Sequence, residues 1–515
     1  MNNFSNIVEM LDIIGSRYPK RVAIVFGAKK VTYHQLREIT KKVAQALYRL
    51  GIREKDKVGL WLHNCPEFVY AYFAILRLNA IVVPINSMFK REEAKFVIED
   101  SGAKILVCSI DKLDESEVIL SRLETLRYLV CVSSCDKTNI LSFSEFIQEG
   151  SPLKERFSIE PDSVAEILYT SGTTGRPKGA CLTHRNLISN VKDSCSAIIV
   201  TKRDCFLCIL PLFHSFASTV CMLLPISTGA KIVIMRTIRP FKRVIRAILK
   251  NRVTIFVGIP SIYNILAETK FSWLQLFLSY FLNPIRVCIS GAAALSKETI
   301  KKFETKFRKP LLEGYGLTEA SPVVSLNPLK GKRKPGSVGI AFPSLEVKII
   351  DKQGESLSRD EIGQLLVRGP SIMRGYYNLE DQTKVSLKDG WLYTGDLAKI
   401  DKEGYIYIMG RIKDMINVRG LNVYPKEIEE LLYTHPQVKE AAVVGVYHRH
   451  RGEVPIAFII KEGDLTERKV TQYLRANLAS YKVPLKVIFK EDLPKNPTGK
   501  ILKKELQKDI ENIFK

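Results

Sequence analysis

Residues 169–179 read YTSGTTGRPKG, and this stretch does most to decide the fold and chemistry of the chain. Its glycines permit backbone conformations that turn amide N–H groups toward a ligand, and its Thr and Ser hydroxyls add donors. Arg176 and Lys178 contribute positive charge. The stretch therefore predicts a polyphosphate-binding loop. Because only two residues separate Gly175 from Lys178, the spacing is not that of the nucleotide-binding P-loop, and a kinase or GTPase is not favoured.

The flanking sequence favours a binding loop over a flexible surface turn, which is the alternative for a stretch rich in Gly and Thr. Residues 164–169 are apolar and predict a buried strand, and residues 184–199 have helical spacing. Anion sites are common where a strand leads into a helix. We therefore expect the phosphate loop at a strand-to-helix junction.

Composition and charge narrow the class of protein. With 515 residues, 46% of them hydrophobic, the chain can form a large core and should divide into at least two domains. Its net charge of +24 suits anionic ligands such as nucleotides, coenzyme A and carboxylates, and also an anionic membrane surface. A generally lysine-rich composition is the alternative explanation. Nucleic-acid binding is not favoured, because the basic residues are scattered rather than gathered into a module with aromatic residues.

The cysteines predict reduced thiols rather than disulfides or a metal site. Ten cysteines are irregularly spaced, and no secretory leader precedes them, which favours a cytoplasmic protein, with a peripheral location on the inner face of the membrane as the alternative. Cys205 and Cys208 form a lone CxxC without a second pair or histidines at ligand spacing. We expect them to pack as small hydrophobic side chains.

Two apolar stretches raise the question of a membrane span. Residues 205–230 carry no charged side chain, but Pro, His and Ser interrupt them, which predicts a strand, a loop, a buried helix and a turn. Residues 271–282 are aromatic and apolar but too short to span a bilayer. They predict either a core helix or an interfacial surface element.

Strand and helix patterns predict an α/β fold. Short β-branched runs alternate with helical segments in residues 22–132 and again in residues 204–307, and Thr32 and Gln35 have the spacing of a capping box at the first expected helix. Overall we expect a large N-terminal domain of stacked α/β sheets over residues 1–410, a β-rich antiparallel or barrel-like subdomain within it at residues 335–410, and a small mobile α+β C-terminal domain over residues 411–515.

Further motifs follow the phosphate loop in a fixed order. They are PLFHSFA around His214, SGAA at residues 290–293, YGLTE at residues 315–319, YTGD at residues 393–396, GRIKDMINVRGLNVYPKEIE from Gly410, and PTGKILKKEL with Lys500. In this combination the chain resembles the adenylate-forming acyl-CoA synthetases over nearly its whole length. The resemblance implies that a carboxylate attacks the α-phosphate of ATP to give acyl-AMP and pyrophosphate, and that coenzyme A then displaces AMP. ATP, Mg²⁺ and coenzyme A are the implied cofactors.

The resemblance also implies a role for each matched residue. The β- and γ-phosphates would be held by Thr170, Ser171, Gly172, Thr173, Thr174, Gly175 and Lys178. Glu319, with Thr170, would bind Mg²⁺, and Thr318 would lie beside the α-phosphate. The adenine slot would be formed by Tyr315 with Ala292, Glu313, Gly314 and Gly316, and the ribose would be held by Asp396 and Arg411.

The matched residues of the expected C-terminal domain imply movement between the half-reactions. Lys500 would bridge the substrate carboxylate and the α-phosphate, whose repulsion otherwise opposes attack. Lys413 occupies the family's hinge position, and Gly420 would line the coenzyme A tunnel. Arg419 stands where a small residue is common, which leaves an acyl carrier protein open as an alternative acceptor.

The acid itself is less narrowly determined. An α-amino acid is disfavoured, because no Asp lies between Asp204 and Asp351 to pair with its ammonium group. His214 matches a position near the acyl carboxylate and the thiol channel, and the remaining acyl-binding candidates are Gly258, Ile259, Pro260, Tyr263, Gly291 and Ser321. A medium- or long-chain fatty acid is our first expectation and an aryl acid the second. A noncatalytic acyl-nucleotide-binding or membrane-associated protein is the remote alternative.

Overall fold

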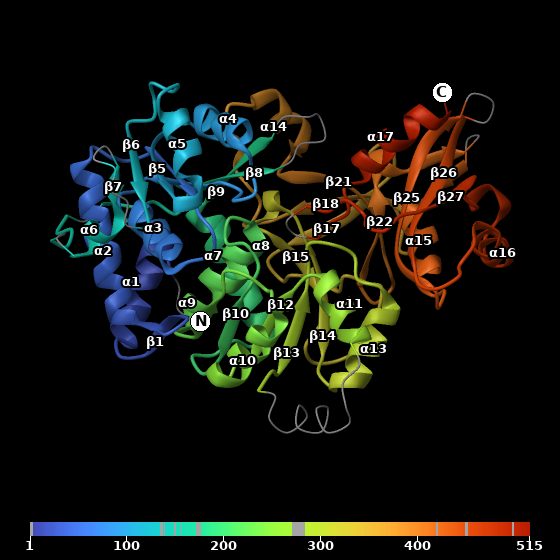
Figure 1. Cartoon of the computed structure of the whole chain (residues 1–515), viewed down its shortest axis with the longest axis horizontal. Helices are drawn as coiled ribbons and strands as arrows, with labels where there is room; N and C mark the ends of the chain where they lie inside the picture. Colours follow the sequence, from blue (N-terminus) through green and yellow to red (C-terminus); the bar gives the residue numbers. More distant parts are fainter. Residues whose placement is uncertain are drawn as a thin grey trace.

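Two large sheets form most of the molecule (Figure 1). The computed structural model describes residues 4–133, 137, 140–148, 151–155, 157–170, 177–269, 284–418, 421–448, 452–496 and 499–514. The expected loop residues Ser171, Gly172, Thr173, Thr174 and Gly175, together with Gly420 and residues 271–282, lie outside the described residues.

The first large sheet has nine strands in the order β16-β15-β14-β13-β12-β10-β11-β1-β2. Strands β1 and β10 to β14 pair in parallel, and β2, β15 and β16 add antiparallel edges. The bounds are β1 (Val22–Phe26), β2 (Lys29–Thr32), β10 (Cys205–Cys208), β11 (Lys231–Ile234), β12 (Ile255–Gly258), β13 (Val287–Ser290), β14 (Leu311–Gly316), β15 (Val323–Leu326) and β16 (Ile340–Ala341).

The second large sheet has eight strands in the order β19-β9-β8-β4-β3-β5-β6-β7. All its pairings are parallel except β8 with β9 and β9 with β19. The bounds are β3 (Lys57–Trp61), β4 (Ile81–Pro84), β5 (Ala103–Cys108), β6 (Tyr128–Cys131), β7 (Leu141–Ser142), β8 (Val164–Thr170), β9 (Lys178–Thr183) and β19 (Gly375–Tyr376).

The two large sheets share one hydrophobic core. Val82 of β4 faces this core together with Phe206 of β10, whereas Ile81 and Val83, on the other face of β4, join a separate cluster. This alternation follows from the two-residue period of a strand, and burial on both faces explains why the strands are almost wholly apolar. Stacked α/β sheets, as expected from the sequence, are therefore confirmed.

Helices connect and cover these strands. Thr32 and Gln35 form the expected capping box, but the helix they cap is the second of the chain, because α1 precedes it. The bounds are α1 (Ile7–Arg17), α2 (Tyr33–Arg49), α3 (Pro66–Arg77), α4 (Arg91–Ser101), α5 (Leu113–Leu120), α6 (Phe143–Gln148), α7 (His184–Ile198), α8 (Ser215–Ala217), α9 (Leu224–Thr228), α10 (Phe241–Asn251), α11 (Pro260–Glu268), α13 (Lys297–Phe307) and α14 (Glu380–Ser386).

A third sheet forms the β-rich part that the sequence predicted. It is antiparallel, with the order β17-β18-β21-β20 and with β22 also paired to β21. The bounds are β17 (Glu346–Ile350), β18 (Gly363–Arg368), β20 (Leu387–Lys388), β21 (Trp391–Ile400) and β22 (Ile406–Arg411).

A small C-terminal domain completes the chain and has its own sheets and core clusters (Figure 1). A hairpin of β23 and β24 stands beside a sheet in the order β25-β26-β27. The bounds are β23 (Ile416–Val418), β24 (Leu421–Val423), β25 (Val438–His448), β26 (Gly452–Lys461), β27 (Lys486–Phe489), α15 (Pro425–Tyr433), α16 (Glu467–Asn477) and α17 (Lys503–Phe514).

The expectations for the cysteines and the uncharged stretch hold. Cys205 and Cys208 are free, buried residues of β10. Residues 205–230 run through β10, a loop, α8, a buried π-helical segment (Ser218–Leu223) and α9, and turn at Gly229. Among the described helices, none has both the length and the apolar character that crossing a bilayer requires.

Candidate active site

Four neighbouring strands of the nine-stranded sheet lead directly into candidate residues. β10, β12, β13 and β14 are parallel neighbours, so their carboxyl ends lie along one edge. In open α/β sheets this edge is where ligands bind. The candidates that follow the four strands are His214, Gly258 to Pro260, Gly291 and Ala292, and Tyr315 to Glu319.

The buried Asp396 and the half-buried Arg411 form an ion pair held by the third sheet. They lie opposite each other on β21 and β22, and the Arg411 Nε is 3.0 Å from the Asp396 Oδ1. The Tyr315 hydroxyl donates to the other carboxylate oxygen at 2.5 Å. Burial, and then the Asp396 charge, raise the pKa of Tyr315 well above its usual value, so the phenol stays protonated as a donor. The structure thus brings together the residues expected at adenine and ribose.

Glu319 is oriented by a tyrosine that the sequence did not reveal. The Tyr376 hydroxyl donates to the Glu319 Oε1 at 2.8 Å, and the Lys178 ammonium lies 5.1 Å from the centre of the Tyr376 ring. Tyr376 belongs to β19, which pairs with β9. The residue therefore links the end of the phosphate loop to the expected Mg²⁺ ligand. In the sequence, the only sign of Tyr376 was the aromatic pair in GYYN, which is far along the chain from both Glu319 and Lys178.

The donor set around Glu319 fits a magnesium ion bound mainly through phosphate oxygens. No cluster of three or more acidic, His or Cys side chains at ligand spacing occurs among the described residues. Mg²⁺ commonly uses one or two carboxylates together with substrate phosphates and water. Glu319 can supply one carboxylate oxygen while Tyr376 engages the other.

The expected phosphate loop lies between two antiparallel strands, β8 and β9, and the expected strand-to-helix junction is wrong. Residues 178–183 form β9, which pairs with β8 in a register that places Thr170 opposite Lys178. Helix α7 begins only afterwards, at His184, with Thr183 as its cap. The short run KGACLT has only one β-branched residue, Thr183, so its strand depends on pairing with β8 and β19 rather than on its own propensity. Phosphate binding here would rest on loop donors and Lys178 rather than on a helix N-terminus.

The expected adenine slot is tightly packed around β14. Glu313 is buried, and its Oε1 accepts from the Leu295 N–H at 3.0 Å. Burial raises the pKa of Glu313 to about 7. A Cβ on Gly316 would lie 2.2 Å from the Pro322 carbonyl oxygen, so a larger residue would displace the backbone. Ala292 has φ +69°, which turns the chain sharply after β13.

The expected acyl-binding residues meet an aromatic wall. A Cβ on Gly291 would lie 2.9 Å from the Phe216 ring, and one on Gly258 would lie 3.0 Å from the Tyr263 ring. The Tyr263 hydroxyl donates to the carbonyl oxygens of Phe256 and Ile289, each at 2.9 Å, and the residue is fully buried. A bound acid could therefore contact only the ring edge of Tyr263, because the hydroxyl is already engaged. Phe216 is the wall residue that the sequence analysis missed, although it lies within PLFHSFA.

Two more of the acyl candidates lie at the same edge of the sheet. Pro260 begins α11 directly after Ile259, which is buried. Ser321 has φ +66°, and its buried hydroxyl has no hydrogen-bond partner among the described residues. An unpaired buried hydroxyl is a group that a ligand could satisfy.

His214 is a neutral group at the start of α8. Its Nδ1 accepts from the Phe216 N–H at 3.3 Å, which caps the helix. Burial lowers the pKa of His214 to about 4, so the imidazole carries no charge at neutral pH. The next residue, Ser215, lies 3.3 Å from the Thr318 hydroxyl. Two motifs about a hundred residues apart are thereby joined.

Lys500 reaches the site from a turn of the C-terminal domain. Asn496 closes this turn by accepting from the Lys500 N–H at 2.8 Å and donating to the Lys500 carbonyl at 2.9 Å. A Cβ on Gly499 would lie 2.7 Å from the Ile259 side chain, so the turn packs directly on the start of α11. Although the residue keeps an exposed surface, burial of its ammonium and then the Arg411 charge lower the pKa of Lys500 to about 8.

The expected hinge lies between the third sheet and the C-terminal hairpin. Lys413 belongs to a single 3-10 turn, Ile412–Asp414, which separates β22 from β23. The residue is exposed, although partial burial of its ammonium lowers its pKa. Nothing in this turn packs into a core, since Ile412 is also exposed.

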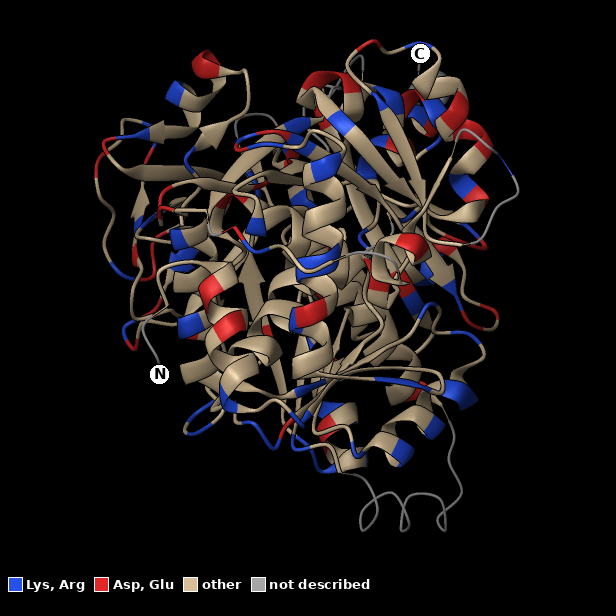
Figure 2. Cartoon of the chain, turned by 90° about the vertical axis from the view of Figure 1, so that its left-hand side faces the viewer, with Lys and Arg blue, Asp and Glu red and all other residues tan. Residues whose placement is uncertain are grey.

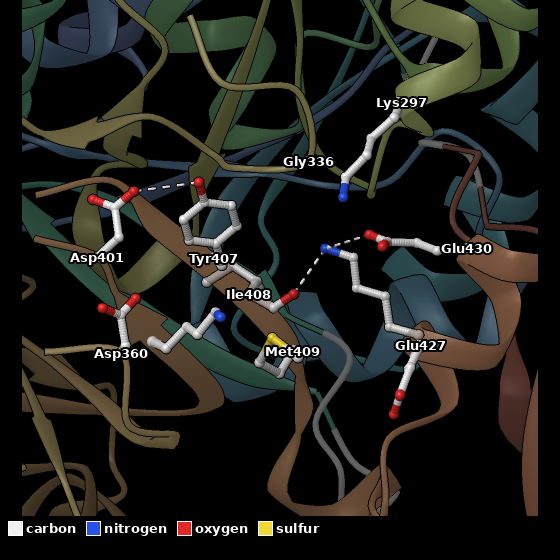
Figure 3. Close-up of a pocket in the computed structure, with 11 residues that line it drawn as sticks. Lys297, Gly336, Asp360, Asp401, Tyr407, Ile408, Met409, Glu427 and Glu430 are labelled. Carbon is white, nitrogen blue, oxygen red and sulfur yellow. Dashed lines mark hydrogen bonds and ion pairs between the residues drawn. The ribbon is translucent and has the colours of Figure 1, made fainter. Parts of the chain in front are cut away.

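A cavity of about 400 Å³ lies between β22 and α15 (Figure 3). The Lys426 ammonium of α15 donates to the Ile408 carbonyl of β22 at 2.7 Å and lies 3.8 Å from Glu430. The other residues that line the cavity are Lys297, Gly336, Asp360, Lys399, Asp401, Tyr407, Met409 and Glu427. The expected site residues are not part of this lining.

Comparison with known families and proteins supports the resemblance to adenylate-forming acyl-CoA synthetases. Residues 12–377 match the model described as AMP-binding enzyme, and residues 427–500 match the model of the AMP-binding enzyme C-terminal domain. A long-chain-fatty-acid–CoA ligase of Bacillus subtilis is 34% identical over 96% of this chain and 93% of its own. A 4-coumarate–CoA ligase of Solanum tuberosum is also 34% identical, over 96% of this chain and 91% of its own.

Solved structures add information on the arrangement of the domains. ATP-bound MatB from Rhodopseudomonas palustris has a TM-score of 0.91 at 31% identity, covering 99% of this chain and all of its own. The apo structure of the same protein has a TM-score of 0.79, covering all of both chains. The present arrangement is therefore more similar to the ATP-bound form than to the apo form.

Proposed function

This chain belongs to the AMP-binding enzyme family, and from that premise we propose that it joins a medium- or long-chain fatty acid to coenzyme A through an acyl-adenylate. The main support for this proposal is the position of Lys500. This residue of the C-terminal domain lies close enough to the Asp396–Arg411 pair for both charges to act on the pKa of Lys500. Two domains thus contribute to one nucleotide site. The curated relatives support an AMP-forming acid–thiol ligase, and the ATP-bound neighbour supports ATP as its nucleotide.

The proposed nucleotide contacts follow from the chemistry of the side chains. A carboxylate has two acceptor oxygens, so Asp396 can accept from both ribose hydroxyls once Tyr315 gives up its bond and turns to the adenine face. Arg411 pairs with this carboxylate and reaches the ribose from the neighbouring strand. Lys178 and the hydroxyl of Thr170, opposite each other across the loop, hold the β- and γ-phosphates.

Adenylation requires two anions to approach each other. The Lys500 ammonium can neutralise the repulsion between the acid carboxylate and the α-phosphate, and because it is partly desolvated its charge acts strongly. Mg²⁺, when bound at Glu319, would neutralise the pyrophosphate as it leaves. Neutral His214 at the adjoining helix start can donate or accept a hydrogen bond beside the carboxylate without adding another charge.

Thioester formation would need a different face of the C-terminal domain. We place the boundary of this domain at residues 410–411 and its hinge at Lys413, because an exposed single turn there joins two separately packed parts. Rotation would withdraw Lys500 and present the segment containing Gly420 to coenzyme A. An acyl carrier protein is the alternative acceptor.

The fatty acyl choice is supported by the walls of the acyl region and by relatives. Gly258, Gly291, Ile259 and the rings of Phe216 and Tyr263 are apolar at the expected position, which suits an alkyl chain. Among the relatives is a long-chain-fatty-acid–CoA ligase. An aryl acid is the second candidate, because the 4-coumarate–CoA ligase is equally similar.

A pyrophosphate-release assay over acids from C2 to C18, together with benzoate and 4-coumarate, tests this proposal with and without coenzyme A. We expect turnover with C8 to C18 acids that depends on coenzyme A. Preference for 4-coumarate or benzoate would replace the fatty acid by an aryl acid. Release limited to a single turnover with coenzyme A, but continuous with an acyl carrier protein, would replace the acceptor. No release with any of these acids would overturn the proposal.

A further inference from the structure

Helix α10 is unusual among the helices that cover the nine-stranded sheet, because little of it is buried. It connects β11 to β12, and among its residues only Val244 is fully buried. By contrast, α11, which follows β12 of the same sheet, has four buried residues among its nine. A crossover helix normally buries a broad apolar stripe against its sheet. Phe241, Ala247 and Ile248 pack partly against the core beside Val244, and the opposite side of α10 is exposed.

The exposed surface of α10 is strongly basic. Lys242, Arg246 and Lys250 follow one another at intervals of one helical turn, and Arg243 lies beside them; all four are exposed. None of the four forms an ion pair with any residue in the described part of the chain. In addition, no Asp or Glu occurs between residues 205 and 267. The positive charge is thus not compensated locally.

Two large aliphatic side chains stand beside this basic row. Ile245 and Leu249 are 39% and 46% exposed, and their spacing of four residues puts them on one face of the helix. Isolated exposed aliphatic residues need no explanation, but here an apolar pair lies along a row of cations. This is the arrangement of a helix that lies flat in a lipid interface, with its cations at the headgroups and its apolar residues among the upper acyl chains.

We propose that α10 docks this protein onto an anionic lipid surface. Arg239 and Arg252, exposed at the two ends of the helix, extend the basic surface. Figure 2 shows Lys and Arg residues along the lower edge of the molecule, the level at which Figure 1 places α10. A nucleic acid would use the cations but not Ile245 and Leu249, and the described α10 surface offers no exposed aromatic ring for bases to stack on.

The position of α10 gives this contact a use in catalysis. The helix leads through the four-residue strand β12 to Gly258, Ile259 and Pro260, the proposed acyl-binding residues. A strand of this length spans only about 13 Å. The lipid surface would thus lie within one strand of the acyl wall. The docking itself does not depend on which acid is activated.

Vesicle sedimentation of the full chain, without ATP or acid, tests the proposal. The probes are vesicles of phosphatidylcholine alone and of phosphatidylcholine with phosphatidylglycerol. We expect binding only to the anionic vesicles, weakened by raising the salt from 50 to 500 mM. The variant R243Q/R246Q/K250Q should reduce the partition coefficient by about 100-fold, since each cation near the surface contributes roughly fivefold. Ile245→Gln with Leu249→Gln should reduce it by at least about tenfold at unchanged net charge.

A matched control separates local docking from net charge. The variant K352Q/K402Q/K439Q removes the same charge from three exposed lysines outside α10 that form no ion pair with the described residues, and it should bind as the wild type does. Pyrophosphate release with octanoate in vesicle-free solution should be the same in all variants. Equal loss in the control variant would overturn the proposal in favour of nonspecific attraction. Unchanged binding of the two α10 variants, or an apolar variant that binds anionic vesicles as tightly as the wild type, would also overturn it.

Discussion

The two halves of the candidate site are held in place by different means. In the large domain, Asp396 is bonded to both Arg411 and Tyr315, and Glu319 is bonded to Tyr376, so each carboxylate is oriented by a neighbour on a paired strand. In the C-terminal domain, the Lys500 turn is closed by Asn496 and by the pairing of Lys495 with Ile501, and the Lys500 ammonium forms no ion pair with the residues that the structure describes. The carboxylates of the large domain are therefore held in place by their neighbours, whereas the position of Lys500 depends on the orientation of the C-terminal domain.

This difference suits a reaction with two stages. A pocket in which only Tyr315 has to turn can hold the adenylate throughout both stages, since it loses little side-chain entropy on binding. A lysine without a fixed partner can leave without breaking a buried ion pair, whose loss would be costly. The four variants below test whether the halves separate in this way.

The largest effect should come from Lys500→Ala. We expect pyrophosphate release to fall by about 1,000-fold, because a charge aimed at the reacting anions is lost. Thioester formation from supplied acyl-AMP should stay within about threefold, measured as release of AMP after addition of coenzyme A. Lys508→Ala, an exposed lysine of the same domain, is the control and should leave both steps unchanged. Equal loss of both steps would contradict the division between the halves.

Asp396→Asn should affect both stages, in contrast to Lys500→Ala. It removes the charge that pairs with Arg411 and leaves the guanidinium half-buried without a counterion. We expect kcat/KM for ATP and for supplied acyl-AMP to fall together, each by about 100-fold. Glu346→Gln breaks an exposed cross-strand pair with Arg368 in the same sheet and should change neither. An effect confined to one stage would mean that the pocket is not shared.

A pH profile addresses Lys500 without removing it. Its pKa of about 8 lies below the usual lysine value, so the charged form should be lost as pH rises through 8 in the free enzyme. We expect kcat/KM for adenylation to fall about tenfold per pH unit above that point. In Lys500→Arg, whose side chain stays charged, the falling limb should move up by more than one unit. If the alkaline limb of the pH profile is the same in Lys500→Arg as in the wild type, the titrating group is not Lys500.

The smallest effect should come from Tyr376→Phe. The ring stays to contact Lys178, but Glu319 loses the hydrogen bond that orients it. Loss of such an outer partner typically weakens metal binding, so the Mg²⁺ concentration for half-maximal activity should rise by about tenfold with little change at saturation. Tyr377→Phe tests the neighbouring tyrosine and should behave as the wild type. A lower maximal rate at saturating Mg²⁺ would point to a structural role instead.

The sequence predicted those features that depend on neighbours along the chain. β-branched runs predicted β1, β3, β4, β5 and β6, and the capping box at Thr32 predicted the start of α2. Three of the motif residues, Asp396, Arg411 and Tyr315, also meet in the structure, and their roles stay predictions. Such signals are local, and local chemistry decides them.

What the sequence could not predict depends on pairings between distant segments. β9 formed where a junction with a helix was expected, because its pairing with β8 and β19 outweighs the pattern that follows it. Tyr376 reaches Glu319 only because β19 adds to that edge, and Phe216 meets Gly291 only through the packing of two neighbouring motifs. The exposure of α10 likewise depends on its packing in the folded chain, where Val244 is its one fully buried residue, and the local sequence does not reveal this.

The single core shared by the two large sheets has a consequence for how the protein unfolds. Residues of both sheets and of the third sheet, such as Val82, Phe206 and Leu365, belong to one continuous cluster, whereas the C-terminal domain has two clusters of its own. Cooperativity follows contiguous packing rather than chain length. The large domain should therefore melt as one calorimetric unit despite its size, and the C-terminal domain should be able to melt first while the nucleotide pocket stays folded.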